Sequence, residues 1–166
     1  MLIEICVCTF RRPSLANTLH SLGKQILPEG ATLRIIVADN DETPSAQDLV
    51  TRFAEGLPFP VHYVHAPSRN ISLARNACLD AATSEFLAFI DDDEIAPPNW
   101  IAELYALLLR GPYDAVFGPA MAEYPAAAPD WIKQTDYHSN VPTRRNGTVQ
   151  TGHTCNALIC TSAPSF

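Results

Sequence analysis

The sequence predicts an α/β fold in which helices cover both faces of a mostly parallel sheet. Short apolar runs alternate with segments whose apolar residues recur at helical spacing. The apolar runs are continuous, as in strands that are buried on both faces of a parallel sheet. The 166 residues contain no internal repeat and no low-complexity linker, and their number is typical of about one domain.

Three strands and two helices are expected in the first part of the chain. The strands are predicted at residues 3–9, 33–38 and 61–65. Pro13 and Ser14 begin the first helix, in which leucines recur at positions 15, 19 and 22. A second helix is predicted over 45–55, where apolar and polar residues also follow a helical period.

The next part of the chain continues the alternation. Residues 70–83 are predicted to form a helix that Asn70 caps and whose small apolar residues allow close packing on a sheet. Residues 86–90 form the most apolar strand, which we expect at the centre of the sheet. A helix follows from Pro97, and a short strand is expected at 116–117. After about residue 120 the pattern loosens, and it recovers only at 156–160.

The charge balance excludes some classes of partner. Eighteen acidic residues against eleven basic ones give a net charge of −7. Because nucleic acids and anionic lipids are bound by basic surfaces, we expect no nucleic-acid partner and no basic lipid anchor. No apolar stretch reaches the roughly 20 residues of a membrane span, and the N-terminus lacks the features of a signal peptide.

Cysteine usage indicates a reducing compartment. The five cysteines are odd in number and include no C-x-x-C pair, so buried thiols are the simplest interpretation. Cys6 and Cys8 are two residues apart in an expected strand, which places them on one face. We therefore expect a cytoplasmic protein.

Polar clusters follow three of the expected strands, at residues 9–12, 39–42 and 91–94. In open α/β sheets, ligands bind outside the carboxyl ends of the strands. A run of acidic residues is often only a solvated surface, but residues 91–94 directly follow the most apolar strand. Oxygen ligands from Asp91 and Asp93 suit Mg²⁺ or Mn²⁺, with water and substrate phosphates filling the other positions.

The glycine-rich loops that hold phosphates in other nucleotide-binding folds are missing. Neither G-x-G-x-x-G nor G-x-x-x-x-G-K-[ST] occurs in the sequence. A phosphorylated ligand would therefore be held through a metal and arginines. Arg11, Arg69 and Arg75 are placed near strand ends or helix starts for this role, although each could also be an ordinary surface residue.

Four motifs in this order carry a resemblance to a known family. They are Cys-Thr-Phe-Arg-Arg-Pro (8–13), Ile-Val-Ala-Asp-Asn-Asp (36–41), Asn-Ile-Ser-Leu-Ala-Arg-Asn (70–76) and Phe-Ile-Asp-Asp-Asp-Glu (89–94). The sequence resembles family 2 glycosyltransferases of the GT-A fold, which is Rossmann-like. With residues 151–158 included, it is most similar to the succinoglycan-biosynthesis glucosyltransferase (ExoM-type) group, over nearly the whole chain.

The resemblance implies a role for each residue that matches a motif. Thr9 and Arg11 would lie beside the nucleotide, Asp39 would accept a hydrogen bond from a uracil imide, and Asn70 and Arg75 would frame the pocket. Asp91, Asp92 and Asp93 would form the D-x-D element. Asp91 and Asp92 are counted with the nucleotide-sugar site, and Asp93, with Asp91, would bind the metal. The metal would act as a Lewis acid on the departing UDP.

The family typically inverts the anomeric carbon in one displacement, which requires a carboxylate base. In the family this base follows the Asn-Ala-Leu strand, so we expect it beyond Phe166 and name no catalytic residue in this sequence. The resemblance thus implies that residues 1–120 form the donor-binding half. Residues 121–166 would be an incomplete acceptor-side region of a fold that is truncated at its C-terminus.

The expected function is transfer of a sugar, glucose by resemblance, from a UDP-sugar to a lipid-linked oligosaccharide in bacterial exopolysaccharide biosynthesis. Membrane contact would be peripheral, at the inner face of the plasma membrane. Two alternatives stay open at this point. One is a binding module without catalysis. The other is a haloacid-dehalogenase-type phosphatase using Asp91 and Asp93, although that family places Thr or Val where Ile95 stands.

Overall fold

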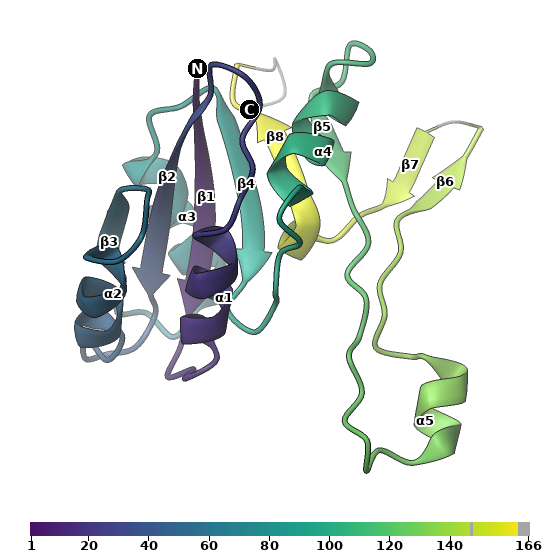
Figure 1. Ribbon diagram of the computed structural model, residues 1–166, viewed down its shortest axis with the longest axis horizontal. Coiled ribbons are helices and arrows are strands. Elements are labelled where there is room, and N and C mark those ends of the chain that lie inside the picture. The colour runs from purple at the N-terminus through teal and green to yellow at the C-terminus, as the bar shows by residue number, and fades with distance from the viewer. Residues whose placement is uncertain (147, 163–166) are drawn as a thin grey trace.

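The computed structural model describes residues 1–146 and 148–162 and has a six-stranded sheet at its centre (Figure 1). The strands, in the order β3-β2-β1-β4-β8-β5, are Val61–His65, Thr32–Asp39, Leu2–Thr9, Phe86–Asp91, Ala157–Cys160 and Ala115–Phe117. Strands β1 to β4 run parallel, whereas β8 is antiparallel to its neighbours β4 and β5. This confirms the predicted α/β fold with a mostly parallel sheet.

Helices cover both faces of the sheet, as predicted. They are α1 (Leu15–Leu22), α2 (Gln47–Ala54), α3 (Ile71–Ala81) and α4 (Trp100–Leu108). Helices α1, α2 and α4 pack on one face, and α3 lies behind the sheet on the other (Figure 1). None of the helices within the described ranges has the length and apolar character that a membrane span requires.

The two faces of β1 belong to two different apolar clusters. Ile3, Ile5 and Val7 pack toward α1 and α4. Cys6 and Cys8 point to the opposite face, where Cys6 is fully buried with Cys78 of α3. Each of the five cysteines is a free thiol; Cys6, Cys78 and Cys155 are buried as expected, whereas Cys8 and Cys160 are only partly buried.

A buried carboxylate lies at the amino-terminal end of the sheet. Glu4 of β1 has no exposed surface and forms an ion pair with Arg34 of β2. Its other oxygen accepts hydrogen bonds of 2.8 Å from the backbone N–H groups of both Thr83 and Ser84. Because these two N–H groups are bound to Glu4, they do not donate to the carbonyl groups of the preceding helical turn. This explains why α3 ends at Ala81 and not at residue 83 as the sequence suggests.

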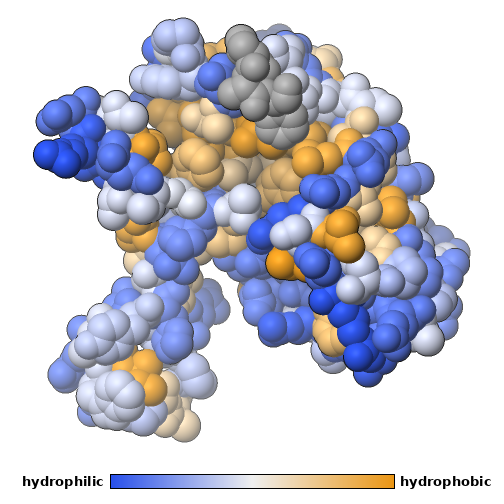
Figure 2. Space-filling model, turned by 180° about the vertical axis from the view of Figure 1, so that it is seen from behind, coloured by the Kyte–Doolittle hydropathy of each residue, from blue (hydrophilic) through white to orange (hydrophobic). Residues whose placement is uncertain are grey.

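Between β5 and β8 the chain forms a projecting arm, defined here as residues 118–146 and 148–151 (Figure 1). It holds α5 (Asp130–Thr135) and an antiparallel pair, β6 (Thr143–Arg145) and β7 (Thr148–Thr151), and a 3₁₀ turn, η1 (Thr154–Asn156), returns it to the sheet. From behind, the arm stands clear of the body (Figure 2), and α5 has no buried residue.

The loss of a regular pattern after residue 120 thus corresponds to the arm, which has little core of its own. The division of the chain at residue 120 into a donor half and an acceptor-side region stays a prediction. Gly147 and residues 163–166, which belong to the second region, lie outside the described residues, as does the base expected beyond Phe166.

Candidate functional site

A pocket of about 460 Å³ lies where β1 and β4 end, at the edge of the sheet that the sequence predicted for the site. Six of the residues singled out from the sequence line it, namely Thr9, Arg69, Arg75, Asp91, Asp92 and Asp93. Arg11, Asp39 and Asn70 are close to the same strand ends but do not line the pocket. The structure therefore brings the predicted residues together in two layers, one facing the pocket and one behind it.

The middle aspartate of the acidic run is turned into the protein. Asp92 is 7 % exposed, and its Oδ2 accepts a hydrogen bond of 2.7 Å from the Thr9 hydroxyl. Burial raises the pKa of Asp92, although this hydrogen bond opposes part of the rise. The side chains of Asp91 and Asp93, by contrast, are each about half exposed, so these two carboxylates are accessible to a ligand in the pocket.

Two consecutive arginines bind the carboxylates of two different strand ends. Arg11 has a left-handed backbone, with φ of 53°. Its guanidinium donates two hydrogen bonds, of 2.8 and 2.9 Å, to Asp41 after β2. The next residue, Arg12, donates one of 3.1 Å to Asp93 after β4. Because β1 lies between β2 and β4 in the sheet, the loop after β1 can reach both neighbours. Arg11 holds the pKa of Asp41 well below its usual range.

Asp39 is fully buried, and its carboxylate is occupied by groups of the protein. Its Oδ1 accepts from the backbone N–H of Asp41, and its Oδ2 accepts from the Ala46 N–H and the Tyr63 hydroxyl, both at 2.8 Å. Burial, followed by the bond to Asp39, raises the pKa of Tyr63 above its usual value. In this structure Asp39 orders the loop after β2, and its contact with a uracil imide stays a prediction.

Asn40 joins the end of β2 to the start of α3. Its Oδ1 accepts hydrogen bonds of 3.0 Å from the Asn70 N–H and from the Ser68 hydroxyl. The Asn70 side chain in turn accepts from the backbone N–H of Ser72 at 2.9 Å, which confirms the predicted cap of α3. Asn70 thus positions the helix, while Asn40 lines the pocket.

Among the residues that line the pocket, Phe10, Arg12 and Asn40 were given no individual role from the sequence. Phe10 is 40 % exposed, and the guanidinium carbons of Arg11 and Arg69 lie 5.4 and 6.0 Å from its ring centroid. The signal that could have indicated it is an aromatic residue within the polar cluster at residues 9–12, directly after an apolar strand. The pocket therefore offers an aromatic face, guanidinium groups and carboxylates together.

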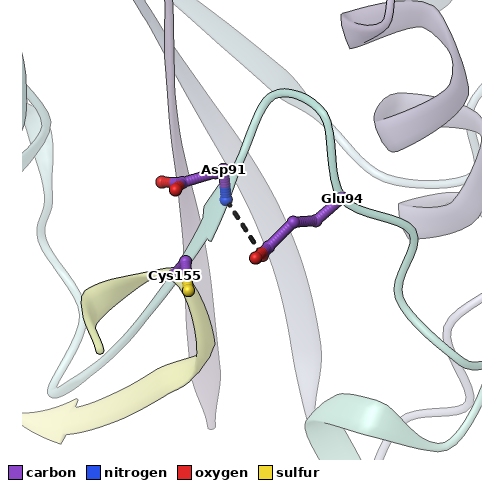
Figure 3. A group of neighbouring side chains, drawn as sticks. All are labelled: Asp91, Glu94 and Cys155. Atoms are coloured by element: carbon purple, nitrogen blue, oxygen red, sulfur yellow. Dashed lines mark hydrogen bonds between the residues drawn. The ribbon is translucent and has the colours of Figure 1, made fainter. Parts of the chain in front are cut away.

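The acidic run continues toward η1. One donor atom from each of Asp91, Glu94 and Cys155 lies within 4.8 Å of the others, and Figure 3 shows the Asp91 N–H donating to Glu94 while the Asp91 carboxylate points away. Burial, followed by hydrogen bonding to Glu94, raises the pKa of Cys155 to about 12. The thiol is therefore protonated near neutral pH, and the charged donors at this end of β4 are carboxylates.

The donor set fits a hard divalent cation. Asp91 and Asp93 present half-exposed carboxylates to the pocket, and burial raises the pKa of Asp91 while Arg75, 3.9 Å away, opposes the rise. A rise caused by burial means that the negative charge lacks sufficient compensation from the protein. Carboxylate oxygens with open positions for water and phosphate are the ligands that Mg²⁺ and Mn²⁺ prefer.

A second pocket, of about 610 Å³, adjoins the first at Asp93, which lines both. It lies between the end of β4 and the base of the arm, and its lining includes Glu94, Trp100, Met121 and His138. This pocket was not predicted from the sequence, because the arm that forms one wall is distant from β4 along the chain. The two pockets thus share one carboxylate in their lining.

Comparison with known proteins places the chain in a family. The family described as Glycosyl transferase family 2 matches residues 4–163. Over 164 residues the chain is 48 % identical to the succinoglycan biosynthesis protein ExoM of Rhizobium meliloti, a match that covers 99 % of this chain and 53 % of ExoM. The chain thus spans about half the length of this relative.

Solved structures share the fold. The TarS 1–349 structure from S. aureus superposes with a TM-score of 0.72 at 17 % identity, over 98 % of this chain and 48 % of that one. The mannosyltransferase PcManGT from Pyrobaculum calidifontis, in complex with GDP-Man and Mn²⁺, gives a TM-score of 0.63 at 25 % identity. That match covers 70 % of this chain and 34 % of PcManGT.

Proposed function

Because the chain belongs to glycosyl transferase family 2, we propose that it binds a nucleotide-sugar donor in the first pocket and takes part in transfer of the sugar. The observation that carries this proposal is the pairing of two half-exposed carboxylates, Asp91 and Asp93, with the guanidiniums of Arg12 and Arg75 in one pocket. A metal-bound diphosphate needs both kinds of group.

Asp93, with Asp91, would hold Mg²⁺ or Mn²⁺. A bound cation of this kind supplies Lewis-acid stabilisation of the leaving diphosphate. Asp92 would support the site from behind through its bond to Thr9. Phe10 offers its exposed ring to the base, and Arg75 is in a position to bind phosphate oxygens. That PcManGT holds a nucleotide sugar together with Mn²⁺ supports this assignment of ligand classes.

The finer proposal is a UDP-sugar donor, glucose by resemblance, and a lipid-linked saccharide acceptor in the synthesis of a succinoglycan-type exopolysaccharide. The identity to the Rhizobium meliloti protein supports the pathway. The second pocket would receive the acceptor, since it adjoins the donor pocket at Asp93. The proposal places the reaction in the cytoplasm, with peripheral contact at the membrane that carries the acceptor.

Binding without turnover is the second candidate, because none of the described residues is assigned as the carboxylate base that the transfer requires. Family membership leaves no support for the phosphatase alternative. Release of UDP from UDP-glucose in the presence of acceptor lipid separates the first two candidates. A chain that binds UDP with metal but never releases it from the sugar would be a binding module.

Calorimetric titration of UDP tests the donor site itself, with Mn²⁺ present and again with EDTA. We expect binding that requires the metal and is lost in Asp93→Asn. The control is Asp80→Asn, which removes an exposed carboxylate near the end of α3 and should leave binding unchanged. A folded chain that binds no UDP in either condition would contradict the proposal.

A further inference from the structure

We propose that Arg12 competes with the divalent cation for Asp93, so that the metal binds weakly until a nucleotide diphosphate draws the guanidinium away. The proposal rests on the metal site proposed above. It concerns Arg12, which was not given a role in metal binding there. Its consequence is that metal and nucleotide strengthen each other's binding.

The contact that carries the inference is the Arg12–Asp93 pair. Arg12 Nη1 lies 3.1 Å from Asp93 Oδ2, at the carboxylate expected to bind the metal directly. A guanidinium and a divalent cation at one carboxylate repel each other, so each lowers the occupancy of the other. The contact is a single hydrogen bond between side chains that are 56 % and 47 % exposed. Such exposed pairs are weak enough to be exchanged.

The neighbouring arginine shows what a fixed pair looks like in the same loop. Arg11 donates two hydrogen bonds to Asp41, and the Asp41 side chain is only 1 % exposed. That carboxylate also accepts from the Glu42 N–H and the Thr43 hydroxyl. Asp93 accepts only from Arg12 among the described residues. Arg12 is therefore the arginine of this loop that can change partners.

A destination for the displaced guanidinium is present in the same pocket. Arg12 lines the pocket beside Arg75, so rotation of its side chain would keep it within reach of a diphosphate bound there. The planar fork of a guanidinium matches phosphate oxygens well. A nucleotide diphosphate thus attracts Arg12 and frees Asp93 in one step. The affinity of the chain for each of the two ligands is therefore higher when the other is bound.

The test measures Mn²⁺ binding without nucleotide, from the electron paramagnetic resonance signal of free Mn²⁺. We expect Arg12→Gln to bind Mn²⁺ about three- to tenfold more tightly than the unmodified chain, in line with removal of a partly screened charge. Arg52→Gln, which makes the same change in net charge on the exposed face of α2, serves as the control. Its affinity for Mn²⁺ should stay within about twofold of that of the unmodified chain.

The same titration with saturating UDP completes the test. UDP should tighten Mn²⁺ binding in the unmodified chain by a larger factor than in Arg12→Gln, because the variant has no competitor to displace. Equal Mn²⁺ affinities of Arg12→Gln and the unmodified chain without UDP would overturn this inference while leaving the metal site intact. Failure of the unmodified, folded chain to bind Mn²⁺ in either condition would overturn both the inference and the proposed function.

Discussion

The hydroxyl of Thr9 donates a hydrogen bond of 2.7 Å to Asp92, and this bond joins the ends of β1 and β4 beneath the pocket. Both residues are buried, with 3 % and 7 % of their surface exposed. Holding Asp92 in this position leaves its neighbours in the acidic run directed outward. The middle aspartate therefore acts as a structural anchor for the two that face the ligand.

Replacing Thr9 by valine should destabilise the fold. The variant keeps the shape of the side chain but leaves the buried Asp92 carboxylate without this donor, at a cost of about 1–3 kcal/mol in the free energy of unfolding. Urea denaturation measures the loss. Thr9→Ser is the matched control, because it retains the hydroxyl and should recover most of the stability. A Thr9→Val chain as stable as the original would mean that the bond contributes nothing.

Removal of the Tyr63 hydroxyl tests the ordering of the loop after β2. Tyr63→Phe takes one donor from the fully buried Asp39 carboxylate and should cost about 1 kcal/mol of stability near neutral pH. The pKa of Tyr63 is raised in the folded state, so tyrosine in the unfolded chain ionises first as pH rises past about 10. The advantage of the original chain over the variant should accordingly shrink above that pH.

Denaturant unfolding at pH 8 and at pH 11 provides the comparison. Tyr113→Phe is the control, since Tyr113 is half exposed. Its effect should be small and similar at both pH values. A Tyr63→Phe penalty that grows at pH 11 would contradict the assigned sign.

The buried charge of Glu4 gives a prediction at the acid end of the pH range. Burial alone would raise its pKa, but hydrogen bonds from Ser84, Thr83 and Arg34 outweigh burial and lower it overall. Glu4→Gln breaks the pair with Arg34 and should cost about 2–4 kcal/mol at pH 7, since one partner of a largely buried pair is left behind. Thermal or urea unfolding of both chains measures this difference.

The sign of the pH dependence follows from the lowered pKa. An ionised Glu4 favours the folded state, so its contribution is complete above the unfolded pKa near 4.5 and is lost as pH falls through the lower folded value. The gap between the original chain and Glu4→Gln should therefore narrow as pH falls below about 4.5. Glu29→Gln, an exposed exchange, should show no such gap at any pH.

The parallel part of the fold could be predicted from the sequence because its strands are continuous apolar runs with helical segments between them. The position of β8 in the sheet could not be predicted from the sequence. Its four residues pair with β4 and β5 across long stretches of chain, and such non-local pairing leaves no mark on local periodicity. The early end of α3 has a similar cause, since the amides that would extend it are bound by Glu4 in β1.

The position of the candidate site followed from its strand ends, and the acidic run lies where the pattern indicated. The partners of its side chains were not visible in the sequence. The left-handed φ of Arg11 separates it from Arg12, so that consecutive guanidiniums serve different strands. Asp39 likewise ends an apolar strand in the sequence, but only the structure shows that its carboxylate is fully occupied.

Asn156 fixes the base of the arm and offers a test of that junction. Its Oδ1 accepts from Trp100 Nε1 at 2.8 Å, and its Nδ2 donates to the Pro119 carbonyl at 2.9 Å. Asn156→Ala should cost about 1–2 kcal/mol in stability and speed proteolytic cleavage within the arm. Asn17→Ala, on the exposed face of α1, should be neutral or slightly stabilising. Unchanged cleavage of the arm in Asn156→Ala would show that other contacts hold it.

Phe10 gives the sharpest test of where a nucleotide base would lie. Its ring is 40 % exposed in the pocket, and guanidiniums of Arg11 and Arg69 lie against it. Stacking of a base on an aromatic ring contributes about 1–3 kcal/mol, so Phe10→Leu should weaken UDP binding by about tenfold in the presence of Mn²⁺. Phe10→Tyr keeps the ring and should bind UDP nearly as well as the original chain.

Inorganic diphosphate separates stacking from a general disturbance of the pocket. It carries the same phosphate linkage as UDP but has no base, so its affinity for Phe10→Leu and for the original chain should be equal. Calorimetry with both ligands on all three chains makes the comparison. If Phe10→Leu weakened diphosphate as much as UDP, the ring would be supporting the loop after β1 and its two arginines. Selective loss of UDP affinity would instead place the base on Phe10, because only the ligand that carries a base would then depend on the aromatic ring.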